Sequence, residues 1–294
     1  MPKIAVIGGT GYLASIIKNQ NNSKKNKYFF FSRKKNSKNF INFSNNGNYQ
    51  QLLKKFHLII HLAGPNQSQI EKKKGLIKLK NNITTKICDI CINHNIKLIY
   101  ISSMQVYKNY GNKDINQNSI IDHKNLYARS HYESEKIIFK KLKKYNRKFT
   151  ILRLGNVFGY LKKFDLKKFS KNIIHDFCKS ALDKQRLIVK NGIIQRQFIP
   201  SQIFVKIINT TINKKIFNNS VSNVGYKVFN LKEISSIIRE RYKRIYNKSI
   251  DLKINNFKEK RKNLIILNKN YKFKFDRQKI NFEIEKVLIN IKRN

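Results

Sequence analysis

The first 155 residues alternate between short apolar runs and longer segments in which apolar residues recur every three or four positions. The apolar runs have the length of β-strands and span residues 4–8, 28–32, 58–63, 98–103 and 150–154. Helical periodicity occurs near residues 11–20, 47–56, 68–94 and 127–145. Strands that alternate with helices predict an α/β fold, with a Rossmann-type, doubly wound parallel sheet covered by helices on both faces.

After residue 155 the pattern loosens, and segments such as RLIVKNG (186–192) and IIQRQFIPSQIF (193–204) mix strand and helix signals. We therefore expect a first domain over 1–155 and a smaller C-terminal lobe over 156–294, with a segment at about 195–212 returning to the first domain. The sequence has no internal repeat and no Gly- or Pro-rich linker, which favours one compact body.

The first predicted strand leads directly into a glycine-rich turn, AVIGGTGYLA at 5–14. Gly8 would allow a tight turn, Gly11 would let backbone amides approach a pyrophosphate, and Ala14 would let helix and strand pack closely. The anion would lie at the N-terminus of the following helix, where the N–H groups and the dipole favour negative charge. This arrangement predicts a dinucleotide site in the domain over 1–155.

A site of this type usually has a carboxylate after the second strand, which binds the adenosine ribose hydroxyls. Here the second strand ends in FFFSRKKN (29–36), and the first acidic residue of the chain is Glu71. Arg33, with Ser32 beside it, offers donors for a 2′-phosphate. The sequence therefore favours NADP(H) over NAD(H).

The formal net charge of +47 comes almost entirely from lysines that occur in every segment, together with abundant asparagine and isoleucine. This mixture is typical of drift in an AT-rich coding sequence, so we interpret the lysines as solvated side chains and not as a dedicated nucleic-acid face. We still expect nonspecific polyanion binding at low salt. No run approaches the ~18 apolar residues of a membrane helix, and MPKIAVIGG contains no secretory leader, so we expect a soluble cytoplasmic protein without membrane contact.

Three cysteines could suggest a metal or redox site, since Cys88 and Cys91 form a C-x-x-C with His94 following. A zinc site needs four converging ligands, and only Cys178 remains as a further thiol. The two cysteines fall on the apolar stripe of a predicted helix. We therefore expect core packing and no metal.

Eight motifs occur in order along the chain: GGTGYLA, LIIHLAG (58–64), NNITT (81–85), YISSMQVY (100–107), YARSHYESE (127–135), LRLGNVFG (152–159), NGIIQRQFI (191–199) and SNVGYKVFNLKEI (222–234). Together they resemble the extended short-chain dehydrogenase/reductase family, and within it the NAD-dependent epimerase/dehydratase branch that acts on nucleotide sugars. The resemblance implies cofactor binding by the first two motifs. The residues concerned are Gly8, Thr10, Gly11, Tyr12, Leu13, Leu62, Ala63 and Gly64.

The same resemblance implies the catalytic and substrate-binding residues. Ser103 would hydrogen-bond the reacting sugar oxygen, and Tyr127 would exchange its proton while the nicotinamide exchanges hydride at the same carbon. Asn156 would lie near the phosphates of the substrate. Arg196 would pair with its diphosphate, for which a guanidinium fork is suited.

Several positions depart from the family pattern. The lysine expected four residues after the tyrosine is His131, which could donate a ring N–H to the nicotinamide ribose but is only partly charged near neutral pH. We therefore expect weaker catalysis or an acidic pH preference. The Asp–Glu pair of the sugar 4,6-dehydratases is Met104–Gln105, so a dehydratase is improbable.

Two tyrosine–cation pairs compete for the catalytic role, Tyr127 with His131 and Tyr132 with Lys136. Residues five apart on a helix are rotated by about 140°, so the two pairs point to different faces. Tyr127 and His131 align with apolar positions such as Ile138, whereas Lys136 aligns with further lysines. We therefore assign catalysis to Tyr127 and His131.

The sequence leaves a 4-epimerase and a 4-keto reductase open, both acting on a nucleoside diphosphate sugar bound by the C-terminal lobe. The alternative is a catalytically weakened member that binds a dinucleotide or RNA. The resemblance also implies a homodimer formed through the helices at 81–94 and 127–145.

Overall fold

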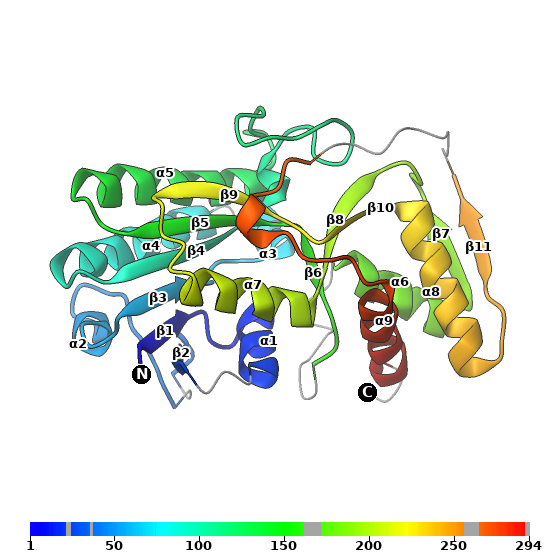
Figure 1. The fold of residues 1–294 in the computed structure, drawn as a ribbon, viewed down its shortest axis with the longest axis horizontal. Coiled ribbons are helices and arrows are strands. Elements are labelled where there is room, and N and C mark those ends of the chain that lie inside the picture. The colour runs from blue at the N-terminus through cyan, green and yellow to red at the C-terminus, as the bar shows by residue number, and fades with distance from the viewer. Residues whose placement is uncertain (22–24, 36–37, 74, 162–171, 256–264, 292–294) are drawn as a thin grey trace. The chain divides into compact units, whose positions relative to one another are not determined.

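The computed structural model describes residues 1–21, 25–35, 38–73, 75–161, 172–255 and 265–291 (Figure 1). These residues form two compact units. The first comprises 1–108, 121–154 and 205–223, and the second comprises 109–120, 155–204 and 224–294. The chain thus leaves the first unit briefly over 109–120 and again after Leu154, and it returns over 205–223, whereas the sequence suggested about 195–212.

The first unit is built on a six-stranded sheet in the order β2-β1-β3-β4-β5-β9. The strands are β1 (Lys3–Ile7), β2 (Lys27–Phe31), β3 (Leu58–His61), β4 (Lys97–Ser103), β5 (Phe149–Leu154) and β9 (Ser220–Val224). The pairs from β2 through β5 are parallel, which confirms the predicted Rossmann-type sheet. The five strands expected from the sequence end within two residues of their predicted limits, whereas β9 was not predicted.

The helices of this unit cover both faces of the sheet, with α4 and α5 on one face and α1 and α7 on the other (Figure 1). They are α1 (Tyr12–Gln20), α2 (Tyr49–Leu53), α3 (Gln67–Lys72), α4 (Leu76–Asn93), α5 (Leu126–Lys144) and α7 (Ser201–Asn213), with a short 3₁₀ helix at Met104–Val106. The helical pattern near 68–94 is divided between two helices, since α3 ends at Lys72 and Gly75 is the N-cap of α4. Glycine is a poor helix former, which favours a break at this point.

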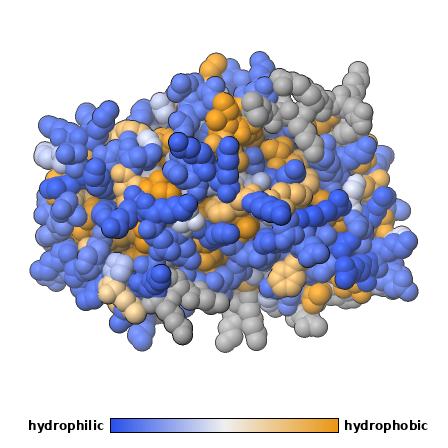
Figure 2. Space-filling model, in the orientation of Figure 1, coloured by the Kyte–Doolittle hydropathy of each residue, from blue (hydrophilic) through white to orange (hydrophobic). Residues whose placement is uncertain are grey.

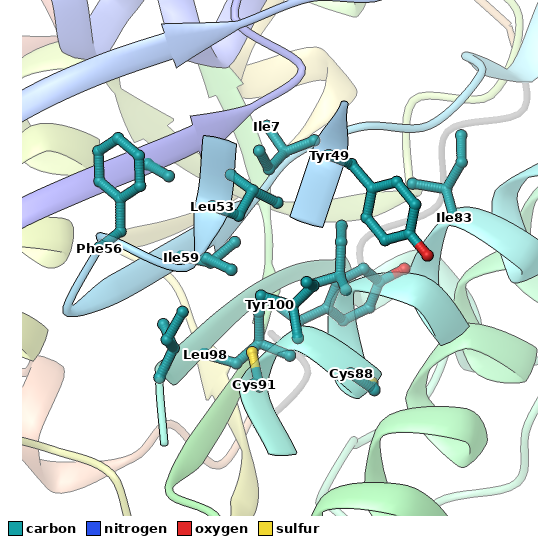
Figure 3. Packing of buried hydrophobic residues seen from close by; sticks show 14 of the residues in the cluster. Ile7, Tyr49, Leu53, Phe56, Ile59, Ile83, Cys88, Cys91, Leu98 and Tyr100 are labelled. Atoms are coloured by element: carbon teal, nitrogen blue, oxygen red, sulfur yellow. The ribbon is translucent and has the colours of Figure 1, made fainter. Parts of the chain in front are cut away.

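Between the sheet and α4 lies a hydrophobic core that includes Ile59, Leu98 and Tyr100 (Figure 3). Cys88 and Cys91 lie within this core as free thiols, which agrees with the packing role expected for them. Burial raises the pKa of Cys88 to about 12, so this thiol stays protonated. Among the described residues no group of three or more His, Cys, Asp or Glu side chains could hold a metal ion.

The described residues of the second unit form two small sheets and three helices that pack together. Its strands are β6 (Asn156–Phe158), β7 (Arg186–Val189), β8 (Gln195–Pro200), β10 (Lys227–Asn230) and β11 (Asp251–Ile254), in the orders β10-β8-β6 and β11-β7. Its helices are α6 (Ile173–Lys184), α8 (Leu231–Tyr246) and α9 (Arg277–Ile291), with a 3₁₀ helix at Lys269–Tyr271. Within the described ranges, no helix combines the length and apolarity that crossing a membrane would need.

Hydrophilic side chains cover most of the face shown in Figure 2, and the hydrophobic ones form small patches between them. On this face, the distribution fits polar side chains that are solvated.

Candidate active site

The glycine-rich turn follows the carboxyl end of β1 and lies next to the carboxyl end of β3. The strand order of the sheet reverses at this point. Gly8 adopts φ +97°, and a Cβ there would lie 2.9 Å from the backbone N of Ala63. A Cβ on Gly9 would lie 2.8 Å from the carbonyl carbon of Phe30. The N–H groups of both glycines donate to the carbonyl of Phe31, at 3.1 and 2.7 Å. The turn is therefore held tightly against β2 and β3, and Gly9 is a requirement that the sequence analysis missed.

Helix α1 begins directly after this turn. Gly11 is its N-cap and makes no side-chain capping bond, while the N–H of Gly11 donates to the carbonyl of Gly8 at 2.9 Å. Tyr12 and Leu13 lie in the first turn of the helix, and Ala14 is fully buried. The helix thus presents the N-terminal backbone that an anion would bind.

The segment Leu62–Gly64 follows β3 and lies beside the glycine turn. The N–H of Leu62 donates to the carbonyl of Ile7 at 2.9 Å, which continues the pairing of β1 and β3. Because main-chain atoms fill the space that a side chain would need at Gly8, the two turns approach each other through their backbones. A cradle of this kind fits the pyrophosphate of a dinucleotide.

At the end of β2, Ser32 is buried and Arg33 is exposed. The hydroxyl of Thr10 lies 3.2 Å from that of Ser32, so the two predicted residues meet. The Ser32 hydroxyl also accepts from the N–H of Lys34 at 3.2 Å. Ser32 therefore anchors the turn after β2, and Arg33 projects from it.

Ser103 and Tyr127 come together from β4 and α5. Ser103 is the last residue of β4, and its hydroxyl accepts from the N–H of Gln105 at 3.1 Å. Asn125 caps α5 and accepts from the N–H of Tyr127 at 2.9 Å, which fixes the start of the helix. Burial raises the pKa of Tyr127 to about 12, and a hydrogen bond with Ser103 opposes this rise. The phenol is therefore protonated at neutral pH in the protein alone.

His131 lies one helical turn after Tyr127, and the two rings are 4.7 Å apart between centroids. Its Nδ1 lies 3.2 Å from the hydroxyl of Tyr100. Burial, followed by the charge of Lys80, holds the pKa of His131 well below its usual value. The expectation of a partly charged imidazole was wrong, because the ring is enclosed beside a lysine and stays neutral at neutral pH.

The competing pair points elsewhere, as the helical geometry predicted. The ammonium of Lys136 is exposed and lies 5.3 Å from the ring centroid of Tyr132, which also contacts His123 at 5.5 Å. Tyr132 and Lys136 therefore form a cation–π contact of their own, away from Ser103.

A buried polar network that the sequence analysis missed lies directly behind Ser103. Arg153 of β5 donates to Glu135 of α5 at 2.5 and 3.0 Å, and Ser102 donates to the same carboxylate at 2.5 Å. Arg153 also donates to Tyr107 at 2.8 Å, and Tyr107 donates to Asn223 at 2.7 Å. Burial alone would lower the pKa of Arg153. The hydrogen bonds and the charge of Glu135 outweigh this effect, so the pKa of Arg153 is raised. An arginine inside the apolar strand motif TILRL was the available signal.

The two substrate-binding residues predicted from the resemblance lie in the second unit. The side-chain amide of Asn156 donates to the carbonyl of Gln197 at 3.3 Å. Arg196 donates through one guanidinium nitrogen to the carbonyl of Tyr110 at 2.6 Å, and its guanidinium stacks 4.7 Å from the Tyr110 ring centroid. Burial lowers the pKa of Arg196, and nearby Tyr110 opposes that effect. A Cβ at Gly111 would lie 1.6 Å from this nitrogen, so the glycine makes room for the arginine.

Known proteins are similar to this chain in sequence and in fold. Residues 4–225 match the model of the NAD dependent epimerase/dehydratase family. No curated protein matches the chain. Among solved structures, the fold is shared with the UDP-N-acetylglucosamine 4-epimerase of Methanobrevibacter ruminantium M1, at 20% identity, TM-score 0.78 and coverage of 100% of this chain and 99% of that one.

Two further structures show the same fold. The UDP-Glc/GlcNAc 4-epimerase of Campylobacter jejuni is 17% identical with TM-score 0.79, and each chain is covered completely. The UDP-glucuronic acid 4-epimerase of Bacillus cereus, solved with UDP-glucuronic acid and NAD, is 17% identical with TM-score 0.77, and 99% of each chain is covered.

Proposed function

Because the chain belongs to the NAD-dependent epimerase/dehydratase family, we propose that it oxidises and reduces the sugar ring of a nucleoside diphosphate sugar, as a 4-epimerase or a 4-keto reductase. The observation that carries this proposal is that Ser103, the last residue of β4, and Tyr127 of α5 come together, so that the Ser103 hydroxyl opposes the rise in the pKa of the buried phenol. The related structures named for UDP-sugars, one of them solved with NAD, support the substrate class and the cofactor.

The backbone cradle around Gly8 and Gly9 fits a nicotinamide dinucleotide, since any Cβ at these positions would collide with main-chain atoms. In this proposal the turn from Gly8 to Leu13 holds the pyrophosphate, and Leu62–Gly64 lies against the bound cofactor. When bound, the dinucleotide would supply hydride exchange at the reacting sugar carbon.

Ser103 and Tyr127 would handle the proton of the reacting sugar oxygen. The hydroxyl of Ser103 would donate a hydrogen bond to that oxygen, and Tyr127 would take its proton as the carbon is oxidised and return it as the carbon is reduced. A phenol with its pKa raised to about 12 holds its proton at neutral pH, so a proton is present for the keto group to receive. Accepting a proton requires a positive charge nearby that stabilises the phenolate.

The residues next to Ser103 make a dehydratase an unsuitable assignment. Met104 is fully buried, and Gln105 can neither release nor take up a proton near neutral pH. The acidic pair that elimination of water would need is therefore replaced by side chains without that chemistry.

The cofactor preference in this proposal is for NADP(H). Arg33 is exposed next to the anchored Ser32, and no carboxylate occurs before Glu71 to bind a ribose diol. A guanidinium at this position would pair with a 2′-phosphate.

The proposal includes a homodimer formed through α4 and α5. A cavity of about 340 Å³ between these helices is lined by Ile77, Leu126, Arg129 and Glu133, and Leu79 is 40% exposed on α4. Sedimentation of the full chain at moderate salt would give the mass of a dimer if this face is an interface. A monomer at all accessible concentrations would contradict it.

The function is tested by incubating the protein with NAD(P) and a panel of nucleotide sugars, and by following the isomer ratio and the bound species by mass spectrometry. Tyr127→Phe should lower turnover by roughly 10²- to 10⁴-fold with cofactor affinity little changed, because only the proton-transferring hydroxyl is lost. Tyr132→Phe is the matched control on the other face of α5 and should cost far less.

Two outcomes would contradict the proposal. If Tyr132→Phe abolishes turnover while Tyr127→Phe stays active, the catalytic tyrosine has been assigned wrongly. If neither the wild-type protein nor any variant converts a nucleotide sugar, while dinucleotide or RNA binding persists, the non-catalytic alternative is supported.

A further inference from the structure

A lysine with a buried ammonium lies close to the Tyr127–His131 pair. Lys80 of α4 is only 2% exposed. Its ammonium donates to the hydroxyl of Ser130 at a long 3.4 Å, and this is the one hydrogen bond it makes to the described part of the chain. An ammonium has three donors, and burying it without partners is costly. The site is therefore short of an anionic or polar group.

The surroundings of Lys80 are the groups that define the proposed active site. Its Cε and Nζ lie 3.2 and 3.6 Å from where a Cβ on Gly64 would stand, so it passes beside the turn after β3. Its ammonium lies 5.8 Å from the ring centroid of Tyr100, whose hydroxyl lies 3.2 Å from Nδ1 of His131. The hydroxyl of Ser130 in turn donates to the carbonyl of Tyr127 at 2.8 Å. Lys80 thus reaches from α4 to the turn of α5 on which the family has its lysine and this chain has His131.

Nearby carboxylates influence Lys80 without binding it. Glu135 is bonded by Ser102 and Arg153. Glu133 of α5 is bonded by Arg129 at 2.6 Å and by Asn81 at 2.7 Å. Burial lowers the pKa of Lys80 to about 7, with Glu135 and then Glu133 opposing the shift.

Two histidines also face Lys80. Burial, and then the charge of Lys80, lowers the pKa of His61 on β3 to about 3, so this ring is neutral. His131 on α5 is kept neutral in the same way. With its pKa near 7, Lys80 is therefore the group among these three side chains that can carry positive charge at neutral pH.

We propose that Lys80 supplies, from α4, the positive charge beside the catalytic tyrosine that a lysine at position 131 would otherwise supply, and that His131 acts only as a neutral spacer. This inference rests on the proposed function. Lys80 is a positioning residue that acts through its field: the proton passes between the sugar oxygen and the phenol of Tyr127, and Lys80 acts in its protonated form, which the bound anionic dinucleotide would favour. A positive charge near a phenolate favours the deprotonated form.

Three proteins separate the charge of Lys80 from its packing. Lys80→Met removes the charge and keeps a long unbranched side chain. Adding His131→Lys to that variant returns a cation at the position of the family lysine. Lys78→Met is the control for net charge, because Lys78 is exposed on the same helix and its loss changes the net charge equally. Since Lys78 also lines the cavity between α4 and α5, sedimentation must give this variant the same mass as the wild type.

The first readout does not depend on turnover. Calorimetric titration with NADH is done in buffers of different ionisation enthalpy, about one pH unit above the pKa of Lys80, where the lysine of the free protein is mostly neutral. The wild type and Lys78→Met should take up most of a proton on binding, since the anionic dinucleotide favours the ammonium. Lys80→Met should take up none. Equal proton uptake in Lys80→Met and Lys78→Met would overturn the proposal.

The second readout is the pH dependence of turnover. Lys80→Met should lose roughly tenfold in kcat, with KM for the sugar nearly unchanged and the rising limb shifted to higher pH by about one unit, which corresponds to one pKa unit at the phenol. The double variant should regain most of that loss. Turnover of Lys80→Met equal to that of Lys78→Met, or no recovery in the double variant, would also overturn the proposal.

The two proposals fail in different ways. If the wild type and Lys78→Met convert no nucleotide sugar, the proposed function fails, and the proton uptake alone decides the role of Lys80. Circular dichroism checks that each variant is folded, and Lys80→Gln serves as a second charge-free variant with the same expected result.

Discussion

The ion pair between Arg153 and Glu135 should make the protein sensitive to the loss of either partner and tolerant of the loss of both. The two side chains are only 5% and 2% exposed, and they share a doubly hydrogen-bonded contact with a shortest N–O distance of 2.5 Å. Arg153→Met would leave the carboxylate of Glu135 buried with only Ser102 as a donor. Breaking a buried pair in this way costs about 3–5 kcal/mol in the free energy of unfolding.

The double variant Glu135→Met, Arg153→Met gives the sharper result. Two independent losses would add to about 6–10 kcal/mol, whereas replacing a whole buried pair with apolar side chains is often close to neutral. We therefore expect the double variant to be more stable than either single variant. Arg129→Met is the control, since the Arg129–Glu133 pair on the same helix has side-chain exposures of 53% and 23%. Its loss should cost less than about 1 kcal/mol.

The assay is equilibrium unfolding in urea followed by far-ultraviolet circular dichroism, because the chain contains no tryptophan. The two units can unfold in separate steps, so the transition that Arg153→Met displaces should be the same one that Glu135→Met displaces. The reasoning is refuted if Arg153→Met costs no more than Arg129→Met, or if the double variant costs the sum of the single ones.

Three further predictions concern the glycine turn, the cofactor and Lys80. Gly9→Ala should lower the unfolding free energy by about 1–3 kcal/mol, because its Cβ would lie 2.8 Å from Phe30, whereas Gly75→Ala, with nothing within 4 Å, should be neutral or stabilising in the same thermal melts. NADP(H) should bind more tightly than NAD(H) in calorimetry at fixed salt, and Arg33→Ala should remove the difference; equal wild-type affinities would contradict this. The pKa of Lys80 falls from 10.5 to about 7 on folding, so the unfolded chain binds more protons between these values. Wild-type stability relative to Lys80→Met should therefore rise with pH across that window, by at most about 1.4 kcal/mol per unit, and a flat difference in urea unfolding would contradict it.

The sequence was sufficient to predict the parallel sheet, because each strand from β1 to β4 is a mainly apolar run followed by a helical pattern, and β5 is a further apolar run that contains Arg153. It was also sufficient to separate Tyr127 from Tyr132, since the helical period alone places them on different faces. These features depend on local periodicity, which a single sequence displays directly.

Features that depend on contacts between distant segments were missed. The buried pair of Glu135 and Arg153 joins a helix to a strand, and neither residue type is expected inside. Lys80 looked like one more surface lysine in a chain with 63 lysines and arginines, and only the packing of α4 against Tyr100 reveals it as buried. Strand β9 was missed because SVSNV has little apolar character. Its neighbour in the sheet is β5, which lies far earlier in the sequence.

The position of β9 limits where the chain can be truncated, and it determines when the sheet becomes complete during synthesis. Residues 220–224 occupy the edge of the sheet next to β5, whose last residue is Leu154. On the ribosome, the sheet therefore lacks its last strand until the whole of 155–219 has been synthesised. A protein ending near residue 155, the boundary suggested by the sequence pattern, would expose β5 as an edge with unpaired N–H and C=O groups, which is a template for aggregation. A recombinant nucleotide-binding domain would have to carry residues 205–224 as well, joined to Leu154 by a short linker.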